Sequence, residues 1–411
     1  MASFFCEDSV AFRSAKVALR QRYFAERKTT MAYNWPVYSV PKNQHLMSSS
    51  DNQPAKQQLT GRGSALRLKN RFEKIELEST FDQLEPDDVH LVGKIKTEYY
   101  DDDANTVVSE NQSPDVDFRY SLNPYRGCVH GCSYCYARPT HEYLGLNAGI
   151  DFESKIFVKP QAANLFRKWL SRKKWRDQVE PVMLSGVTDC YQPCERKLRL
   201  TRQCLEVALE HGQPMRITTK NALVTRDIDL LEKLAALNLV VVTISLGTLD
   251  QSLVRVMEPR SSSPQARLKA IEQLSAVGVP IKVLVAPIIP GLNDAEIPTV
   301  LETASRSGAS RAGYVMLRLP LAVEPVFVDW LETHMPDAKE KILGRVRALR
   351  GGKLYDSDFS QRMKGTGIWA QQIENLFKLH LKKSGLKSGT PPLDCDRFAV
   401  PEVDDGQGRL F

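Results

Sequence analysis

Three cysteines fall within eight residues of this 411-residue chain, in the stretch NPYRGCVHGCSYCYARP. Cys128, Cys132 and Cys135 are separated by three and two residues. Thiolates grouped this tightly are typical ligands of zinc or of an iron–sulfur cluster. A closed zinc site or cubane usually has four protein ligands, and no fourth cysteine lies nearby in the sequence. The spacing therefore predicts a metal centre with one position open to a substrate or cosubstrate.

The alternative is a structural zinc ion or a closed cluster, in which Cys190 or Cys194 supplies the fourth thiolate. Five of the eight cysteines lie between Cys128 and Cys194. This clustering favours metal binding in a reducing compartment over a framework of disulfides.

Composition sets only broad limits. The hydrophobic fraction of 42% and the charged fraction of 26% are ordinary for a soluble globular protein. No apolar run is long enough to span a bilayer and no secretory signal is apparent, so we expect a cytoplasmic protein without a membrane partner. The net charge of +7 permits a nucleic-acid partner without demonstrating one. Residues 165–176 carry six cations beside Trp169 and Trp175, which fits either a nucleic-acid surface or an amphipathic helix with a solvated outer face.

The first part of the chain lacks sustained hydrophobic periodicity. Residues 1–60 are rich in Ser, Gln, Asn, Lys and Pro, and we predict that they are disordered. Residues 1–46 either belong to the native protein or are a leader upstream of its natural start. Residues 61–117 are predicted to be an extension that packs on the core.

From residue 118 onward, nearly continuous apolar or β-branched runs alternate with helical patterns. Such runs are typical of parallel strands buried on both faces, and the alternation is typical of right-handed β/α units. A closed barrel of this type has eight units, and we count six. The six predicted strands are residues 118–122, 181–186, 215–220, 240–246, 281–289 and 313–319.

The sequence therefore predicts an α/β fold, an open partial (β/α)6 barrel over residues 118–335. Helices are predicted for residues 323–383, of which residues 336–383 form a C-terminal extension, and residues 384–411 are predicted to be a tail. In parallel β/α folds, active sites form at the C-terminal ends of the strands. The three cysteines follow the first strand, so the loops after the other strands should converge on them.

The spacing C-x3-C-x2-C, with Tyr134 just before the last cysteine, resembles the motif of the radical S-adenosylmethionine (SAM) superfamily. The stretches SLNPYRGC, VTDCYQPCE, LTRQCLE, TKNALVTRDIDLL, APIIPGLND and LRLP are similar to the DNA repair photolyase-like branch, which is related to spore photoproduct lyase. The resemblance covers roughly residues 118–335. It implies a [4Fe–4S] cluster held by Cys128, Cys132 and Cys135, with SAM bound at the open iron.

The same resemblance implies the reaction. One electron, from a small donor such as flavodoxin or ferredoxin, would cleave SAM into methionine and a 5′-deoxyadenosyl radical, which takes a hydrogen atom from the substrate. The cofactors carry this chemistry, and the protein positions them.

Roles for further residues also follow from the resemblance. The backbone of Tyr134 should lie against the adenine of SAM. Ser185, Gly186 and Thr188 occupy the place of the motif that receives the amino group, where this chain has SGVTD and the family usually has Gly-Gly-Glu.

Three more positions lie at the ends of later strands. Lys220 is placed to meet the methionine carboxylate, and Ser245 is placed for the ribose hydroxyls. The turn that begins at Pro287 matches a segment that flanks the adenine in the family.

Two residues are candidates for a catalytic role. Cys190 is a candidate hydrogen-atom donor, because the lyase relatives quench the substrate radical with a cysteine. When Thr188 and Asp189 are aligned with the lyase, however, Gly186 falls at the donor's place. Tyr136 is a candidate radical relay. The alternatives are a plain buried thiol and a tyrosine that packs beside the cluster.

We therefore expect a radical SAM enzyme, with a lyase that repairs DNA lesions as its most specific form. One alternative is a radical enzyme that modifies or matures RNA, protein or a small molecule. The other is a non-catalytic iron–sulfur protein for electron transfer or sensing.

Overall fold

The computed structural model describes residues 61–66, 68, 70–71 and 95–401. All of them belong to one compact unit, Lys56–Phe411. The predictions made for residues 1–60, and the question of residues 1–46, lie outside the described residues.

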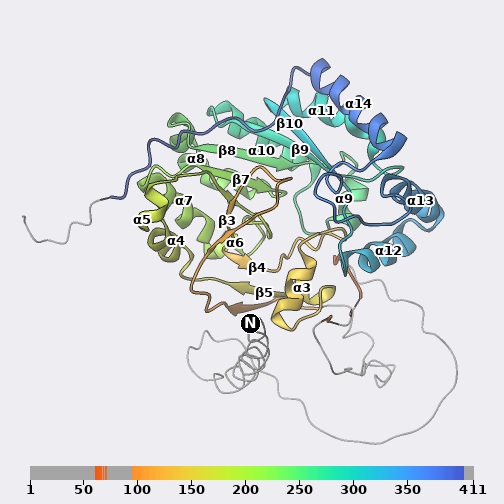
Figure 1. The fold of residues 1–411 in the computed structure, drawn as a ribbon, viewed down its shortest axis with the longest axis horizontal. Coiled ribbons are helices and arrows are strands. Elements are labelled where there is room, and N and C mark those ends of the chain that lie inside the picture. Colours follow the sequence, from red (N-terminus) through yellow and green to blue (C-terminus); the bar gives the residue numbers. More distant parts are fainter. Residues whose placement is uncertain (1–60, 67, 69, 72–94, 402–411) are drawn as a thin grey trace, which may run out of the picture. The chain divides into compact units, whose positions relative to one another are not determined.

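An eight-stranded sheet forms the centre of the described fold (Figure 1), in the order β11–β10–β9–β8–β7–β6–β3–β2. Its six middle strands run parallel to one another. The edge strand β2 (Val108–Glu110) is antiparallel to β3, and β11 (Lys387–Ser388) is parallel to β10. The middle strands are β3 (Tyr120–Leu122), β6 (Val182–Leu184), β7 (Met215–Thr219), β8 (Val240–Ser245), β9 (Ile281–Ile288) and β10 (Arg311–Met316).

All six strands predicted from the sequence are therefore present, with their ends shifted by up to three residues. Because β2 and β11 end the sheet and do not pair with each other in the described part of the chain, the sheet stays open. The prediction of an open, six-unit α/β fold is confirmed.

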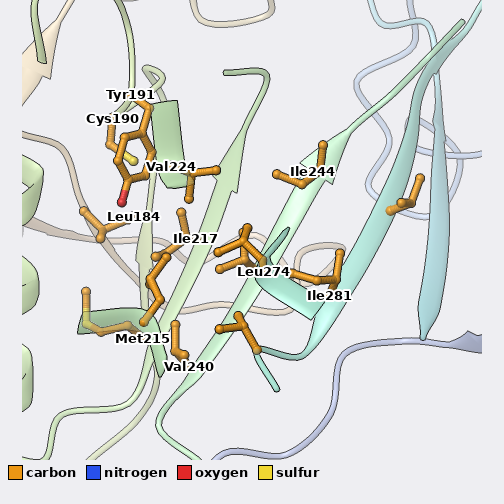
Figure 2. Close-up of a cluster of buried hydrophobic side chains, with 14 of the residues drawn as sticks. Leu184, Cys190, Tyr191, Met215, Ile217, Val224, Val240, Ile244, Leu274 and Ile281 are labelled. Atoms are coloured by element: carbon orange, nitrogen blue, oxygen red, sulfur yellow. The ribbon is translucent and has the colours of Figure 1, made fainter. Parts of the chain in front are cut away.

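The main core lies between the sheet and the helices that follow its strands. Every residue of β8 is buried, as expected for a strand covered on both faces. Figure 2 shows side chains from β6, β7, β8 and β9 packed together in this core. The covering helices are α4 (Ala162–Leu170), α5 (Lys173–Arg176), α7 (Leu200–Glu210), α8 (Ile228–Ala236), α10 (Pro264–Ala276) and α11 (Ile297–Arg306).

Side-chain capping accounts for only some of the helix starts. The Ser263 side chain accepts a hydrogen bond from the Ala266 amide at 3.2 Å and caps α10, as its position before Pro264 predicts. Helix α7, in contrast, begins one residue before Thr201. The Thr201 hydroxyl donates to the Cys190 carbonyl at 2.7 Å and so does not act as the N-cap.

The helical region after the barrel is interrupted. It consists of α12 (Val323–His334), α13 (Lys339–Leu349) and α14 (Gly367–Lys383). The prediction of helix throughout residues 323–383 is wrong for residues 350–366, which form turns and loop. Helix α14 packs against α11 and α13.

The residues after α14 run along the N-terminal edge of the sheet (Figure 1, dark blue). The Thr390 hydroxyl donates to Asp117 at 2.7 Å. Further along, the Asp394 amide donates to the Asn238 carbonyl at 3.0 Å, and the Ala399 amide donates to the His211 backbone carbonyl at 2.9 Å. We refer to residues 387–399 as the C-terminal strap.

A second sheet has three strands, which come before and after β2 and β3 in the sequence. It contains β1 (Glu98–Asp101), β5 (Lys155–Val158) and β4 (Tyr125–Arg126), with β5 in the middle. Residues 127–154 connect β4 to β5 and contain the 3-10 helix η3 (Arg138–Leu144) and helix α3 (Ile150–Ser154). We call residues 127–154 the cysteine loop. Among the residues that the structure describes, no helix is both long and apolar enough to cross a membrane.

Candidate active site

The cysteine loop holds Cys128, Cys132 and Cys135 together. The antiparallel pair β4–β5 fixes its two ends. Inside it, the Cys128 amide donates to the Phe152 carbonyl at 3.0 Å. In two successive turns, the Gly131 amide donates to the Cys128 carbonyl and the Cys135 amide donates to the Cys132 carbonyl. Cys128 and Cys132 are buried and Cys135 is half-buried, and all three are free thiols.

The chemistry of these thiols fits a metal cluster. Burial raises the pKa of the Cys128 thiol, and the neighbouring Asp189, Cys132 and Cys135 raise it further. Three thiolates in one buried loop repel one another, so a bound cationic centre would stabilise the charged form. Within the described residues, no three His, Cys, Asp or Glu side chains converge on a single metal ion. In a cubane each cysteine binds its own iron, so the thiols need not converge on one point.

Asp189 joins the cysteine loop to the ends of two strands. It accepts hydrogen bonds from the Thr219 hydroxyl and the Lys220 amide, both at 2.8 Å. It also lies 3.4 Å from Nδ1 of His130, a fully buried histidine between two of the cysteines. The other ring nitrogen of His130, Nε2, is 3.3 Å from the side-chain nitrogen Nδ2 of Asn221. His130 is thus a bridging residue, and its sequence position as a loop residue did not indicate this.

Tyr134, Lys220 and Ser245 come together, as the resemblance implies. The Lys220 ammonium donates to the Ser245 hydroxyl at 2.9 Å and lies 5.7 Å from the centre of the Tyr134 ring. Lys220 follows β7 and Ser245 ends β8, so two neighbouring strands bring these groups to the edge that carries the cysteine loop. Within the described part of the chain, the Lys220 ammonium has no carboxylate in salt-bridge contact. A cation of this kind is suited to an anionic ligand.

A buried ion pair contacts Tyr134 and Ser245. Arg267 and Glu258 are both about 1% exposed and are paired with each other. Glu258 also accepts a hydrogen bond from the Tyr134 hydroxyl, and Arg267 donates to the Ser245 carbonyl at 2.8 Å. Burial acts to raise the pKa of Glu258, but Arg267 and Lys220 outweigh it and lower that pKa to about 2. The carboxylate therefore stays charged. Its role could not be predicted, because Glu258 and Arg267 lie outside every recognisable motif.

Ser185, Gly186 and Thr188 lie in the loop after β6. The Ser185 hydroxyl accepts from the Cys190 amide at 2.7 Å, and the Thr188 hydroxyl donates to the Tyr125 carbonyl at 3.0 Å. Both hydroxyls are thus engaged within the protein. A Cβ on Gly186 would lie 2.6 Å from the Cβ of Ser121, so this position has no room for a side chain. The assignment of these residues to the amino group of SAM stays a prediction.

Tyr136 connects two distant strands of the sheet. Its hydroxyl donates to the Gly186 carbonyl at 2.8 Å, beyond the end of β6. On its other side, the Arg318 guanidinium lies 5.3 Å from the centre of the Tyr136 ring. Arg318 follows β10, four strands away from β6. Tyr136 is 48% exposed, although surrounding protein raises its pKa to about 12. It therefore lies half-exposed between the ends of β6 and β10.

Arg318 is a candidate binding residue that sequence reasoning missed. Among the residues that the structure describes, its Nε is buried without a hydrogen-bond partner, and one terminal nitrogen donates to the Met363 sulfur at 3.4 Å. Asp115, whose pKa Arg318 helps to lower, is already bound by Nε and one terminal nitrogen of Arg362. The stretch LRLP drew attention to this segment but gave no reason to select its arginine.

Cys190 is enclosed by protein instead. It is fully buried in the main core, where Figure 2 shows it beside Tyr191 and near Leu184 and Val224. Burial raises the pKa of its thiol well above the ordinary value. The structure therefore places the two catalytic candidates differently, with Tyr136 half-exposed and Cys190 enclosed.

Pro287 lies in β9, at the same edge of the sheet as Lys220 and Ser245. The Asn293 side chain donates to the carbonyls of Pro287 and Gly247 at 3.0 and 2.8 Å, which joins the ends of β9 and β8. The Ser245 hydroxyl is 3.3 Å from the Ala286 carbonyl. The position agrees with the segment expected near the adenine, and that role stays a prediction.

Comparison with known proteins agrees with this arrangement. Residues 122–304 match the family described as the Radical SAM superfamily. The matched residues include the cysteine loop and strands β6 to β9. An uncharacterized protein of Mycobacterium tuberculosis (strain ATCC 25618 / H37Rv) is 37% identical over 222 residues, which cover 54% of this chain and 65% of that protein. An uncharacterized protein of Methanocaldococcus jannaschii is 29% identical over 224 residues, 54% of this chain and 79% of that protein. The chain thus spans about 65% of the length of its mycobacterial relative.

Similarity to solved structures is weaker. A spore photoproduct lyase mutant has a TM-score of 0.47 and 17% identity, over 68% of this chain and 78% of that chain. SuiB of Streptococcus suis bound to S-adenosylmethionine has a TM-score of 0.41 and 13% identity, over 66% and 50% of the two chains. Similarities at this level do not bear on the substrate.

The open parallel sheet and the three-cysteine loop at its C-terminal edge define a radical SAM fold. Residues 122–304 of the chain thus belong to the radical SAM superfamily. That family implies a [4Fe–4S] cluster and SAM as cofactors, and the thiols of Cys128, Cys132 and Cys135 are the donor set that suits the cluster.

Proposed function

We propose that this protein is a radical SAM enzyme. Cys128, Cys132 and Cys135 would hold the [4Fe–4S] cluster, and Lys220 and Ser245 would bind SAM. When bound, these cofactors supply a 5′-deoxyadenosyl radical that takes a hydrogen atom from a substrate. The observation that carries the proposal is the meeting of Tyr134, Lys220 and Ser245 beside a loop of three free thiols.

The residues of the chain would bind and orient the cofactors. The Lys220 ammonium offers a charged donor for the carboxylate of SAM, and its contact with Ser245 holds its position. The buried Glu258–Arg267 pair fixes Tyr134 and the end of β8. Preorganised groups of this kind need no rearrangement when the ligand binds. A small electron donor such as flavodoxin or ferredoxin would supply the electron.

We propose a lesion in nucleic acid as the substrate, with a lyase-type repair reaction. The motif stretches similar to the photolyase-like branch support this, and so does Arg318, whose guanidinium suits a phosphodiester beside Tyr136. The basic helices α4 and α5 give no support through stacking. Trp169 and Trp175 are buried, with ring centres 4.2 Å apart, so their faces are not available to bases.

The test of the enzyme proposal is reductive cleavage of SAM. Anaerobically reconstituted protein, given dithionite and SAM, should yield 5′-deoxyadenosine. Cys132→Ala should abolish both the cluster and the product, whereas Cys204→Ala, on helix α7, should keep both. An intact, reducible cluster without 5′-deoxyadenosine would favour an electron-transfer or sensing protein instead.

The substrate proposal needs a separate experiment. Ultraviolet-treated DNA should lose thymine-dimer-type lesions when incubated with the reduced protein and SAM. Arg318→Gln should raise the KM for the DNA and leave cleavage of SAM without DNA unchanged. Cleavage of SAM without any lesion repair would favour RNA, protein or a small molecule as the substrate.

A further inference from the structure

A short segment from outside the region that matches the family packs directly on the cysteine loop. Residues Gly61–Ser64, with the sequence GRGS, are described here as the GRGS turn. Arg62, Gly63 and Ser64 are all buried. The family match begins only at residue 122, so the turn comes from the N-terminal extension.

Gly63 touches the backbone of the cysteine loop. A Cβ on Gly63 would overlap the carbonyl oxygen of Gly131 and would lie 2.6 Å from its carbonyl carbon. The same Cβ would be 3.1 Å from the Ser133 amide nitrogen. Gly131 and Ser133 flank Cys132 on either side. Because the obstacles are backbone atoms, which cannot rotate away, only glycine fits at position 63.

A chain of hydrogen bonds leads from the turn to Cys132. The Gly63 amide donates to Oε2 of Glu153 at 3.0 Å, and Oε1 of Glu153 accepts from Arg138 at 2.9 Å. Arg138 in turn donates to the Cys132 carbonyl from Nε at 3.0 Å and from a terminal nitrogen at 2.9 Å. Glu153 and Arg138 are fully buried. Such a satisfied buried network holds one backbone arrangement, and loss of one member leaves its partners unpaired.

Two arginines, Arg62 within the turn and Arg260 outside it, hold the turn in place through hydrogen bonds. Arg62 donates to the Glu153 carbonyl at 2.6 Å and to the Ile95 carbonyl at 2.6 Å. Arg260 donates from Nε to the Gly61 carbonyl at 2.9 Å, and its own amide donates to the His130 carbonyl at 3.3 Å. Both attachments end at residues that also hold the cysteine loop.

We propose that the GRGS turn is part of the cluster-binding site, with Gly63 and Arg62 as positioning residues that fix the backbone around Cys132. This inference rests on the proposed function, since it assumes that the thiols hold a cluster. The turn would act by holding Cys132 in a ligating position, and not through contact with the iron. The family-matching region alone would then hold its cluster less firmly.

The test compares full-length Gly63→Ala, Arg62→Gln and Gly344→Ala with the wild type after anaerobic reconstitution. Gly344→Ala is the matched control. Gly344 lies outside the turn, at an exposed position on α13, and its Cβ would meet no atom within 4 Å. The measurements are iron and sulfide per chain, the electron paramagnetic resonance spectrum of the reduced cluster with and without SAM, and the rate of iron loss to a chelator. Melting of the iron-free chains shows whether a variant is folded.

Gly63→Ala should hold less than about half of the four irons of a cubane, while Gly344→Ala should match the wild type. Arg62→Gln introduces no overlap. Its amide group can replace one of the two bonds that Arg62 donates to backbone carbonyls. It should therefore lose iron to the chelator about fivefold faster, the effect expected from loss of the other bond, with a changed spectrum. If Gly63→Ala does not fold, Arg62→Gln decides. Iron content, chelation rate and spectrum equal to wild type in the folded variants would overturn the inference. A wild-type protein that takes up no cluster would overturn the proposed function itself.

Discussion

Lys220 gives the sharpest test of how this site would bind SAM. Its ammonium donates to the Ser245 hydroxyl at 2.9 Å and, within the part of the chain that the structure describes, is in contact with no carboxylate. Lys220→Gln removes the positive charge and keeps a side chain of similar shape. If the carboxylate of SAM binds to this group, the variant should bind SAM more weakly and keep its cluster.

The magnitude follows from the kind of bond that is lost. A hydrogen bond to a charged group contributes about 1.5–3 kcal/mol. Since about 1.4 kcal/mol corresponds to a tenfold change in affinity, the Kd for SAM should rise by about 10- to 140-fold. The lower end is expected if the glutamine amide forms a replacement bond, because Lys220 is only half-buried and solvent can enter.

The assay is equilibrium binding of SAM to the cluster-loaded, unreduced protein under anaerobic conditions. Decarboxylated SAM serves as the second ligand, because it lacks the group that Lys220 is expected to meet. Lys220→Gln should weaken the binding of SAM and leave the binding of decarboxylated SAM nearly unchanged. Lys233→Gln, at an exposed position on α8, is the control for a general loss of charge.

Two results would refute this reasoning. Equal affinity of the variant and the wild type for SAM would show that Lys220 does not contact the ligand. Equal losses for SAM and decarboxylated SAM would show that the variant disturbs the site as a whole and that the carboxylate lies elsewhere.

Three further outcomes are expected. Cys190→Ala should keep all iron and lose about 1 kcal/mol of stability in urea unfolding, because this thiol is buried in the main core; loss of iron would instead identify a fourth ligand. Tyr136→Phe removes the 2.8 Å bond to the Gly186 carbonyl and should destabilise the iron-free protein by about 0.5–1.5 kcal/mol, while substrate-free cleavage of SAM, followed as 5′-deoxyadenosine, continues at the wild-type rate. If Tyr136→Phe stopped the cleavage of SAM without substrate, Tyr136 would be needed for that cleavage and would not act on the substrate alone. The pKa of Glu258 is lowered from 4.5 to about 2, so its charge stabilises the fold above pH 4.5, and about 3 kcal/mol of this is lost as the pH falls toward 2. The difference in urea midpoint between the wild type and Glu258→Gln should therefore shrink over that range, and a constant difference would show that Glu258 does not titrate as inferred.

The strands and the metal motif could be predicted because their signals are local. Runs such as VVVTIS at β8 are apolar throughout, and only a strand covered on both faces accommodates them. The three cysteines are likewise close in sequence, so their spacing alone indicates shared ligation. The convergence of Lys220 and Ser245 could be anticipated because both end neighbouring parallel strands.

The missed residues act through contacts that are distant in sequence. Arg318 meets Tyr136 only because the ends of β6 and β10 approach the cysteine loop from opposite sides. Glu258 and Arg267 lie beyond β8, in a stretch that reads as an ordinary loop and helix start. The failed helix prediction at residues 350–366 has a similar cause. Arg350 donates to the carbonyls of Leu317 and Gln361, so contacts made by tertiary folding, and not local propensity, shape that loop.

The C-terminal strap has a consequence for the order in which the protein can be completed. It binds Asp117 just ahead of β3 and pairs with β10, so it touches both the first and the last parallel strand. A ribosome produces residues 387–399 only after the whole barrel sequence has been translated. During synthesis, the edge of the sheet that the strap contacts therefore stays uncovered until residues 387–399 have been made.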